Sequence, residues 1–289
     1  MVKKTLCLSV LFLSILALSG CSMSLKPNWQ NARPDRQTLK SEAIEQKAHL
    51  LFEKAQDKDS LLASITAFEM ALAENPGDYS TLTSLSTQYT LLGTAYTEKQ
   101  KEKSRHFHQA LRYAEQALYS NPAFKEKVAG GTPLWEAIEE LDQGQVEAMF
   151  FWVKALQYQF KEGMNLGAKV FNVRWMKRGL KFLDRIEQVA PEFGGGGVEF
   201  AKGICYYVIP GIMGGSKKLG DEYMARSIAR SDGWLFPRWA RGKYYYVVTG
   251  EDEKSRADLE WVATRNLKNF KDSAPWKIHF QANAKELLN

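Results

Sequence analysis

Three stretches of this chain share one spacing of residues ahead of a proline. In each, a small residue stands twelve positions before the proline, and further anchors stand eight and five positions before it. The sets are Ser64-Phe68-Ala71-Pro76, Ala110-Ala114-Ala117-Pro122 and Gly179-Leu183-Ile186-Pro191, and Gly220-Met224-Ser227-Asp232 keeps the offsets without the proline. On a helix these offsets share one face, and proline stops the helix. The spacing therefore predicts repeated helices that pack through equivalent positions.

The offsets match the second helix of a tetratricopeptide repeat, in which the small residue lets two helices approach. The anchors of a following first helix are Leu82, Leu85, Ser86 and Tyr89. Strand signals are almost absent after residue 38. The repeat is irregular, because the prolines at 76, 122 and 191 lie 46 and 69 residues apart, whereas the usual period is about 34 residues. We predict an all-α domain over residues 39–289, a degenerate tetratricopeptide-like helical repeat array (α-solenoid). Helix pairs that only mimic the repeat are the alternative.

Composition narrows the function classes. The 289 residues are 45% hydrophobic and 25% charged, as in folded globular chains. The 39 basic and 33 acidic residues are scattered, without the basic stripe and aromatic platforms of nucleic-acid binders, so no nucleic-acid partner is expected. Three cysteines are too few for a disulfide framework and match no zinc spacing.

The N-terminus carries an export signal. Lys3 and Lys4 precede an apolar stretch over 6–18, and Leu18-Ser19-Gly20-Cys21 resembles a bacterial lipobox. This pattern predicts a lipoprotein signal peptide over 1–20 and lipidation of Cys21 after cleavage; an ordinary signal peptide is the alternative. Two or three acyl chains would anchor the protein without a spanning helix.

The residues after Cys21 complete this assignment. Ser22 rather than aspartate favours the outer membrane over the inner one, with the protein in the bacterial cell envelope facing the periplasm. Residues 21–38 include Pro27 and Pro34 without apolar periodicity, which predicts a lipidated N-terminus and an extended tether. Cys205 then has no partner thiol for an intramolecular disulfide.

Aromatic residues gather between 134 and 248, and the helix expected over 145–161 is apolar on most faces. Such a helix is covered either by neighbouring helices or by a ligand, and both interpretations stay open. The candidate ligand groove comprises Trp152, Tyr206, Tyr207, Ile212, Met213, Gly214 and Gly215. The two glycines would open a helix whose N–H groups suit an anion, so the groove would fit an amphiphilic acid.

The remaining patterns give no catalytic or metal site. The segment 211–217 lacks the phosphate-loop pattern and favours a tight turn with Ser216 as a helix N-cap. Glycines 194–197 predict a flexible link between helices. No histidine pair, cysteine pair or serine nucleophile pattern occurs, so no enzyme activity, metal or cofactor is expected.

Four basic residues form a stripe on one predicted helix, at spacings that place them on one face. They are Arg174, Arg178, Lys181 and Arg185. A solvated helix face is the plain interpretation. The functional one is contact with an acidic partner or with lipid headgroups.

Several segments together resemble a known family. They are 134–142, 146–152 and, most specifically, Ile209-Pro210-Gly211-Ile212-Met213-Gly214-Gly215 leading into 221–225. These resemble the T component of tripartite ATP-independent periplasmic (TRAP) transporters, a family of lipoproteins with tetratricopeptide-like repeats. Ser216 departs from the acidic residue usual in that family, and the tyrosine run 244–246 is bulkier.

The resemblance implies a non-catalytic periplasmic lipoprotein that forms a homo-trimer and associates with the substrate-binding protein of a TRAP transporter. It is also compatible with an apolar or organic-acid ligand held in a groove. A tetratricopeptide lipoprotein that serves as a scaffold for envelope assembly is the alternative function.

Overall fold

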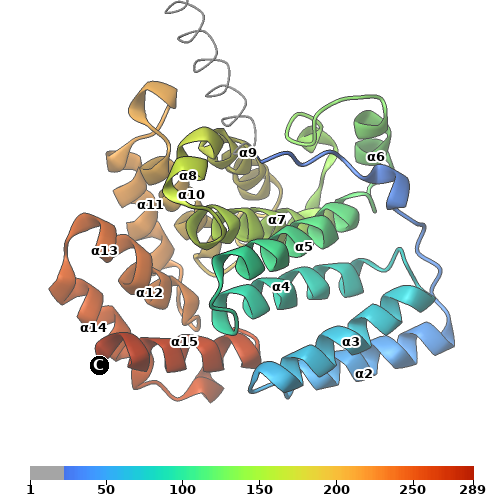
Figure 1. Cartoon of the computed structure of the whole chain (residues 1–289). Helices are drawn as coiled ribbons and strands as arrows, with labels where there is room; N and C mark the ends of the chain where they lie inside the picture. Colours follow the sequence, from blue (N-terminus) through green and yellow to red (C-terminus); the bar gives the residue numbers. More distant parts are fainter. Residues whose placement is uncertain (1–22) are drawn as a thin grey trace, which may run out of the picture.

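The computed structural model describes residues 23–289, so the predicted signal peptide and Cys21 lie outside the described residues. Within this part of the chain every regular element is a helix (Figure 1). The α-helices are α2 (Leu39–Glu53), α3 (Lys58–Glu74), α4 (Tyr79–Ala95), α5 (Gln100–Leu118), α6 (Pro122–Ala129), α7 (Val146–Tyr158), α8 (Leu166–Asn172), α9 (Arg174–Val189), α10 (Gly197–Val208), α11 (Lys217–Ala229), α12 (Phe236–Ala240), α13 (Tyr246–Thr249), α14 (Asp252–Ala263) and α15 (Ala274–Leu288). The all-α, α-solenoid prediction is confirmed.

The four sets of anchor residues lie on α3, α5, α9 and α11, each the second helix of a packed pair. All twelve anchors ahead of the prolines and Asp232 are buried. At Gly179 and Gly220 the two helices of the pair lie so close that a longer side chain would meet the partner helix. At Gly179, for example, an added Cβ would lie 3.3 Å from the Leu156 side chain on α7.

A fifth set of anchors went unrecognised in the sequence. Ser255, Leu259 and Val262 on α14 are buried and have the same offsets ahead of Leu267. The Ser255 hydroxyl donates to the Gly242 carbonyl at 2.8 Å, which fastens α14 to the preceding helix. Like the set that ends at Asp232, this one lacks the terminal proline, because Leu267 stands in its place.

The long spacing between Pro122 and Pro191 comes from insertions before and within the pair formed by α7 and α9. The short helix α6 and the loop 130–145 lie between α5 and α7, and α8 lies between α7 and α9. Asn121 caps α6 through the Phe124 N–H at 3.0 Å and also donates to the Glu140 carbonyl at 2.8 Å. The insertions are therefore ordered parts of the domain.

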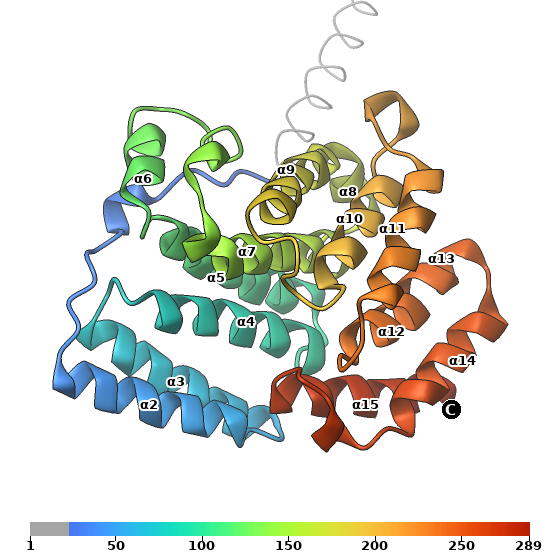
Figure 2. The ribbon, with the colours of Figure 1, turned by 180° about the vertical axis from the view of Figure 1, so that it is seen from behind.

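The array closes on itself rather than remaining open. Helix α15 contacts α2, and both views show it beside the first helix pair (Figures 1 and 2). The Trp276 Nε1–H of α15 donates to the Thr87 hydroxyl of α4 at 3.0 Å. Closure gives the aromatic side chains of the C-terminal half a covered interior without a second layer of helices.

The predicted tether needs a correction. Residues 23–38 are mostly extended, but they bind along the domain instead of spacing it from a membrane. Leu25 is buried, the Asn28 N–H donates to Glu115 at 2.8 Å, and Arg112 donates to the Lys26 carbonyl at 2.7 Å. Low apolar periodicity predicted the conformation, but it carried no information about these contacts with α5.

Candidate ligand cavity

A cavity of about 260 Å³ lies inside the curve of the C-terminal helices. Helices α7, α9, α10, α12 and α13 all contribute side chains to its wall. Its lining residues are Lys154, Gln157, Tyr158, Phe160, Lys161, Lys169, Met176, Phe200, Ile204, Val208, Phe236, Tyr244 and Val248. The volume is close to the lower end of ligand pockets, about 300 Å³, so the cavity suits a small ligand.

Two π-helical turns shape the cavity. They are η4 (Gln159–Gly163), which continues α7, and η6 (Arg241–Tyr245), which continues α12. Each contributes lining side chains, and Glu162 of η4 accepts a hydrogen bond from the Tyr244 hydroxyl of η6 at 2.9 Å. A π-turn widens the helix locally and is frequent at functional sites. The two widened turns therefore face each other at the cavity wall.

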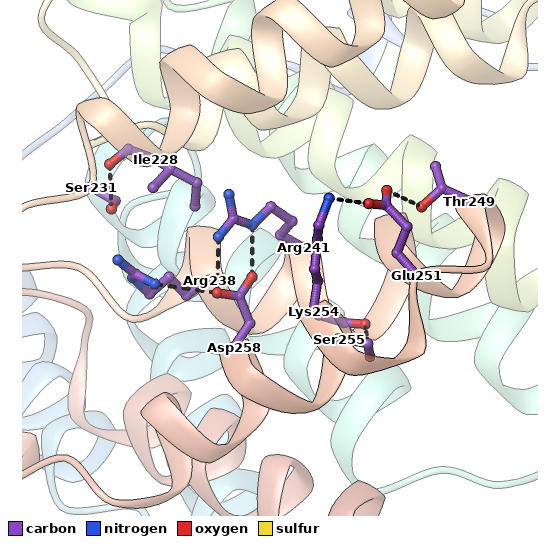
Figure 3. Close-up of polar contacts among 10 residues, drawn as sticks. Ile228, Ser231, Arg238, Arg241, Thr249, Glu251, Lys254, Ser255 and Asp258 are labelled. Carbon is purple, nitrogen blue, oxygen red and sulfur yellow. Dashed lines mark hydrogen bonds and ion pairs between the residues drawn. The ribbon is translucent and has the colours of Figure 1, made fainter.

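A buried carboxylate that does not line the cavity fixes the position of η6. Asp258 of α14 accepts two hydrogen bonds from Arg241, at 2.6 and 2.9 Å, and a third from Arg238 at 3.3 Å (Figure 3). Bidentate guanidinium–carboxylate pairs fix both distance and orientation. Asp258 therefore positions the helix that carries Tyr244 and Phe236 into the cavity wall.

The charged groups of the cavity are cationic. Lys154, Lys161 and Lys169 line it, and over the described part of the chain no aspartate or glutamate is among its lining residues. The Lys169 ammonium donates to the Lys161 carbonyl at 2.8 Å, which keeps it beside η4. Apolar walls with three lysines favour a ligand with an apolar body and an anionic group.

Lys154 is the most distinctive of these groups. Its Nζ lies 3.7 Å from the centroid of the Trp276 ring and 5.6 Å from that of Phe236. Burial lowers the pKa of Lys154 to about 7, while the charge of Asp272 opposes the shift. The lysine therefore changes charge near neutral pH, and an anion in the cavity would favour its protonated form.

A second cavity of about 480 Å³ adjoins the first, and Lys154 and Phe236 line both. The second cavity is different in charge because Glu147 and Asp272 also line it. Burial raises the pKa of both carboxyl groups. Lys154 thus stands between a basic cavity and a cavity with acidic side chains.

The structure places Trp152 outside both cavities. Its indole is 0% exposed and stacks on Phe182 of α9, with ring centroids 4.6 Å apart. The prediction of a groove wall at Trp152 is therefore wrong, and the alternative of a packed core holds for this residue. Tyr206 and Tyr207 are half-buried and do not line the cavity; Tyr206 stacks on Tyr223, and Tyr207 donates to Asp221 at 2.9 Å.

The segment 209–216 forms a tight turn rather than an anion site. The Gly214 N–H donates to the Gly211 carbonyl at 3.0 Å and the Gly215 N–H to the Pro210 carbonyl at 3.1 Å, so neither is available to an anion. Helix α11 begins only at Lys217, with Ser216 as the predicted N-cap, which is confirmed. Ile212 is 99% exposed and Met213 is half-buried, so this part of the predicted groove lies away from the cavity.

The four residues of the predicted basic stripe lie in two different environments. Arg178 stacks its guanidinium 3.5 Å from the centroid of Trp135, and Arg185 donates to the Leu141 and Glu139 carbonyls at 2.8 and 2.9 Å. These two residues fasten the inserted segment 133–142 to α9. Arg174 and Lys181 are exposed.

The cavity residues were not predicted from the sequence, although one signal was present. Lys154 is the one charged residue of 148–160, a stretch otherwise apolar apart from two glutamines. A lone charge in such a helix is costly unless it is paired or functional. The positions of Phe200, Phe236 and Tyr244 around it depend on closure of the array and had no local signal.

Residues 23–289 hold neither a metal cluster nor a spanning helix. In this range no group of three or more His, Cys, Asp or Glu residues could hold a metal ion. None of the helices of the same range is long and apolar enough to cross a membrane.

Comparison with known proteins supports the fold. No model of a known protein family matches the sequence, and no curated protein matches it. The crystal structure of a thermophilic TPR protein of Thermus thermophilus matches with a TM-score of 0.53 at 15% identity, over 86% of this chain and 98% of that chain. At this identity the likeness concerns the fold alone. The protein therefore has the fold of tetratricopeptide repeat proteins.

Proposed function

We propose that the protein is a non-catalytic, lipid-anchored subunit of a TRAP-type uptake system that holds a small organic acid with an apolar chain. The observation that carries the ligand assignment is the cavity with apolar walls and three lysines, which no described acidic residue lines. The segment 209–215 and its neighbours, which resemble the TRAP T component, support the transport assignment. The protein would form a homo-trimer that faces the periplasm and is anchored to the outer membrane in preference to the inner one. Its partner would be the periplasmic substrate-binding protein of the transporter.

Octanoate binding to the purified mature protein tests the ligand assignment. We expect Lys154→Met to weaken binding by about tenfold or more, because a hydrogen bond to a charged group contributes about 1.5–3 kcal/mol and methionine keeps the apolar stem. Calorimetric titration gives the measurement. Lys181→Met is the matched control, since Lys181 is exposed on α9 outside the cavity. Equal affinities of both variants would contradict the assignment.

The pH dependence of the same binding gives an independent check. The pKa of Lys154 is about 7, so the ammonium is present below that pH and lost above it. Octanoate stays ionised from pH 6 to pH 8. Its affinity should therefore fall about tenfold across this range, as the protonated fraction of the lysine falls. A flat profile would show that Lys154 does not hold the carboxylate.

Association with the substrate-binding protein tests the transport assignment. A trimer with three modest contacts can retain its partner through effective concentration, so we expect co-sedimentation of the mixed proteins in analytical ultracentrifugation at micromolar concentration. Absence of a complex at high micromolar concentration, with and without ligand, would favour the second candidate. That candidate is a scaffold for envelope assembly, which the tetratricopeptide-like fold supports on its own.

A further inference from the structure

The described chain begins at a fixed place on the domain. The Met23 N–H donates to the Asn172 side chain at 2.6 Å, and the Trp175 Nε1–H donates to the Met23 carbonyl at 3.2 Å. Only Ser22 separates Met23 from Cys21, and two residue steps span at most about 7 Å. An acyl group on Cys21 would therefore bring the junction of α8 and α9 against the membrane surface.

Helix α8, beside this point, exposes apolar side chains. Leu166 is 80% exposed, Val170 is 66% exposed, and Phe171 is also exposed. The connection between α10 and α11 adds Ile212, and it rises at the same end of the molecule as α8 in both views (Figures 1 and 2). We call Leu166, Val170, Phe171 and Ile212 the α8 face.

Basic residues predominate on the segment that carries α8. The segment 163–183 contains five basic residues and no acidic one, whereas near Ile212 the exposed Lys217 and Lys218 are followed by the exposed Asp221 and Glu222. Lys177 of the first segment is also exposed. Exposed apolar side chains with basic neighbours are typical of surfaces that lie in the headgroup region of anionic membranes.

The opposite end of the molecule differs in charge. Leu50 on α2 is 61% exposed and Met70 on α3 is 59% exposed, so apolar exposure alone does not distinguish the two ends. These two helices, however, carry six acidic residues against three lysines, a balance that an anionic membrane would repel. The charge of the neighbouring residues and the position of Met23 therefore both favour the α8 face as the side that meets the membrane.

We infer that the α8 face is a membrane-docking surface that lies in the headgroup layer of the bilayer to which Cys21 is anchored. This inference rests on the lipid anchor of the proposed function. It adds that the domain sits directly on the bilayer, with helices α2, α3 and α15 directed away from it. Two acyl chains and an apolar face would together fix the orientation of the domain, which acyl chains alone would not do.

The test uses the full lipoprotein, purified from membranes and reconstituted in vesicles of phosphatidylethanolamine and phosphatidylglycerol. An environment-sensitive fluorophore is attached through Val170→Cys, and in a matched control through Met70→Cys. Cys205 is buried, and burial raises the pKa of its thiol to about 12, so it stays unlabelled in the folded protein. We expect lipids with a nitroxide near the headgroup to quench the label at position 170 at least about twofold and to leave the label at position 70 unchanged.

Each other outcome overturns the inference. Equal, weak quenching at both positions, in a protein whose mass shows an acylated Cys21, refutes the docking surface and leaves the lipoprotein assignment intact. A label at position 170 that is shielded only after addition of the substrate-binding protein assigns the α8 face to that protein instead. A mass without acyl groups refutes the lipid anchor, and the docking surface fails with it.

Discussion

Replacement of Trp152 by alanine is expected to lower the free energy of unfolding by about 3–5 kcal/mol, the usual cost of removing a buried aromatic side chain. The indole is fully buried between α7 and α9, where it stacks on Phe182 and lies 6.5 Å from the Trp175 ring, centroid to centroid. The two helices cannot collapse into the space because they already meet closely at Gly179, which packs against Leu156 of α7. Urea unfolding followed by circular dichroism gives the measurement.

Trp152→Phe is the matched control. The Nε1–H of Trp152 has no hydrogen-bond partner among the described residues, so phenylalanine removes no hydrogen bond and keeps the stacked ring. We expect this variant to lose less than about 1.5 kcal/mol. A small loss for alanine, with a separate defect in octanoate binding, would place Trp152 in a ligand site after all.

The repeat anchors were predictable because they are local. A small residue, two further anchors and a proline within thirteen positions define one helix and the face that it packs. The full pattern found three helices of this kind, and its offsets without the proline found α11; α14, whose set of anchors ends at Leu267, has the same offsets and went unrecognised. Local spacing therefore determined the helix pairs and the fold class.

The cavity was not predictable because its walls come from residues far apart in the chain. The contact between Trp276 and Thr87, which belongs to the closure of the array, joins residues 189 positions apart. The π-turns add a second difficulty, since an inserted residue shifts the helical faces on which periodicity depends. Sequence periodicity consequently placed Trp152 beside a groove and left out Lys154, whose lone charge was the better signal.

A run of glycines such as 194–197 can form either a flexible link or a rigid turn. Four glycines predicted a flexible link, but the structure uses three of them at fixed positive φ, at Gly194, Gly195 and Gly196. An added Cβ on Gly196 would lie 2.2 Å from the Ser227 carbonyl oxygen of α11. The Ser227 hydroxyl in turn donates to the Gly196 carbonyl at 2.7 Å. The segment is a tight joint between α10 and an anchor residue of α11, which corrects the prediction of flexibility.

Gly196→Ala should therefore be among the most damaging single substitutions in the chain. A side chain at φ +87° costs about 1–3 kcal/mol, and the overlap with a backbone carbonyl adds about 1–3 kcal/mol because that carbonyl cannot rotate away. The strain falls at the start of α10, which carries Phe200, Ile204 and Val208 into the cavity wall, so octanoate affinity should fall together with stability.

Gly211→Ala is the control, since a Cβ there meets no atom within 4 Å, and its effect should stay within about 0.5 kcal/mol. Equal unfolding free energies for the two variants would mean that the glycines form a flexible link, and the cavity wall would then lack the fixed joint on which its shape depends.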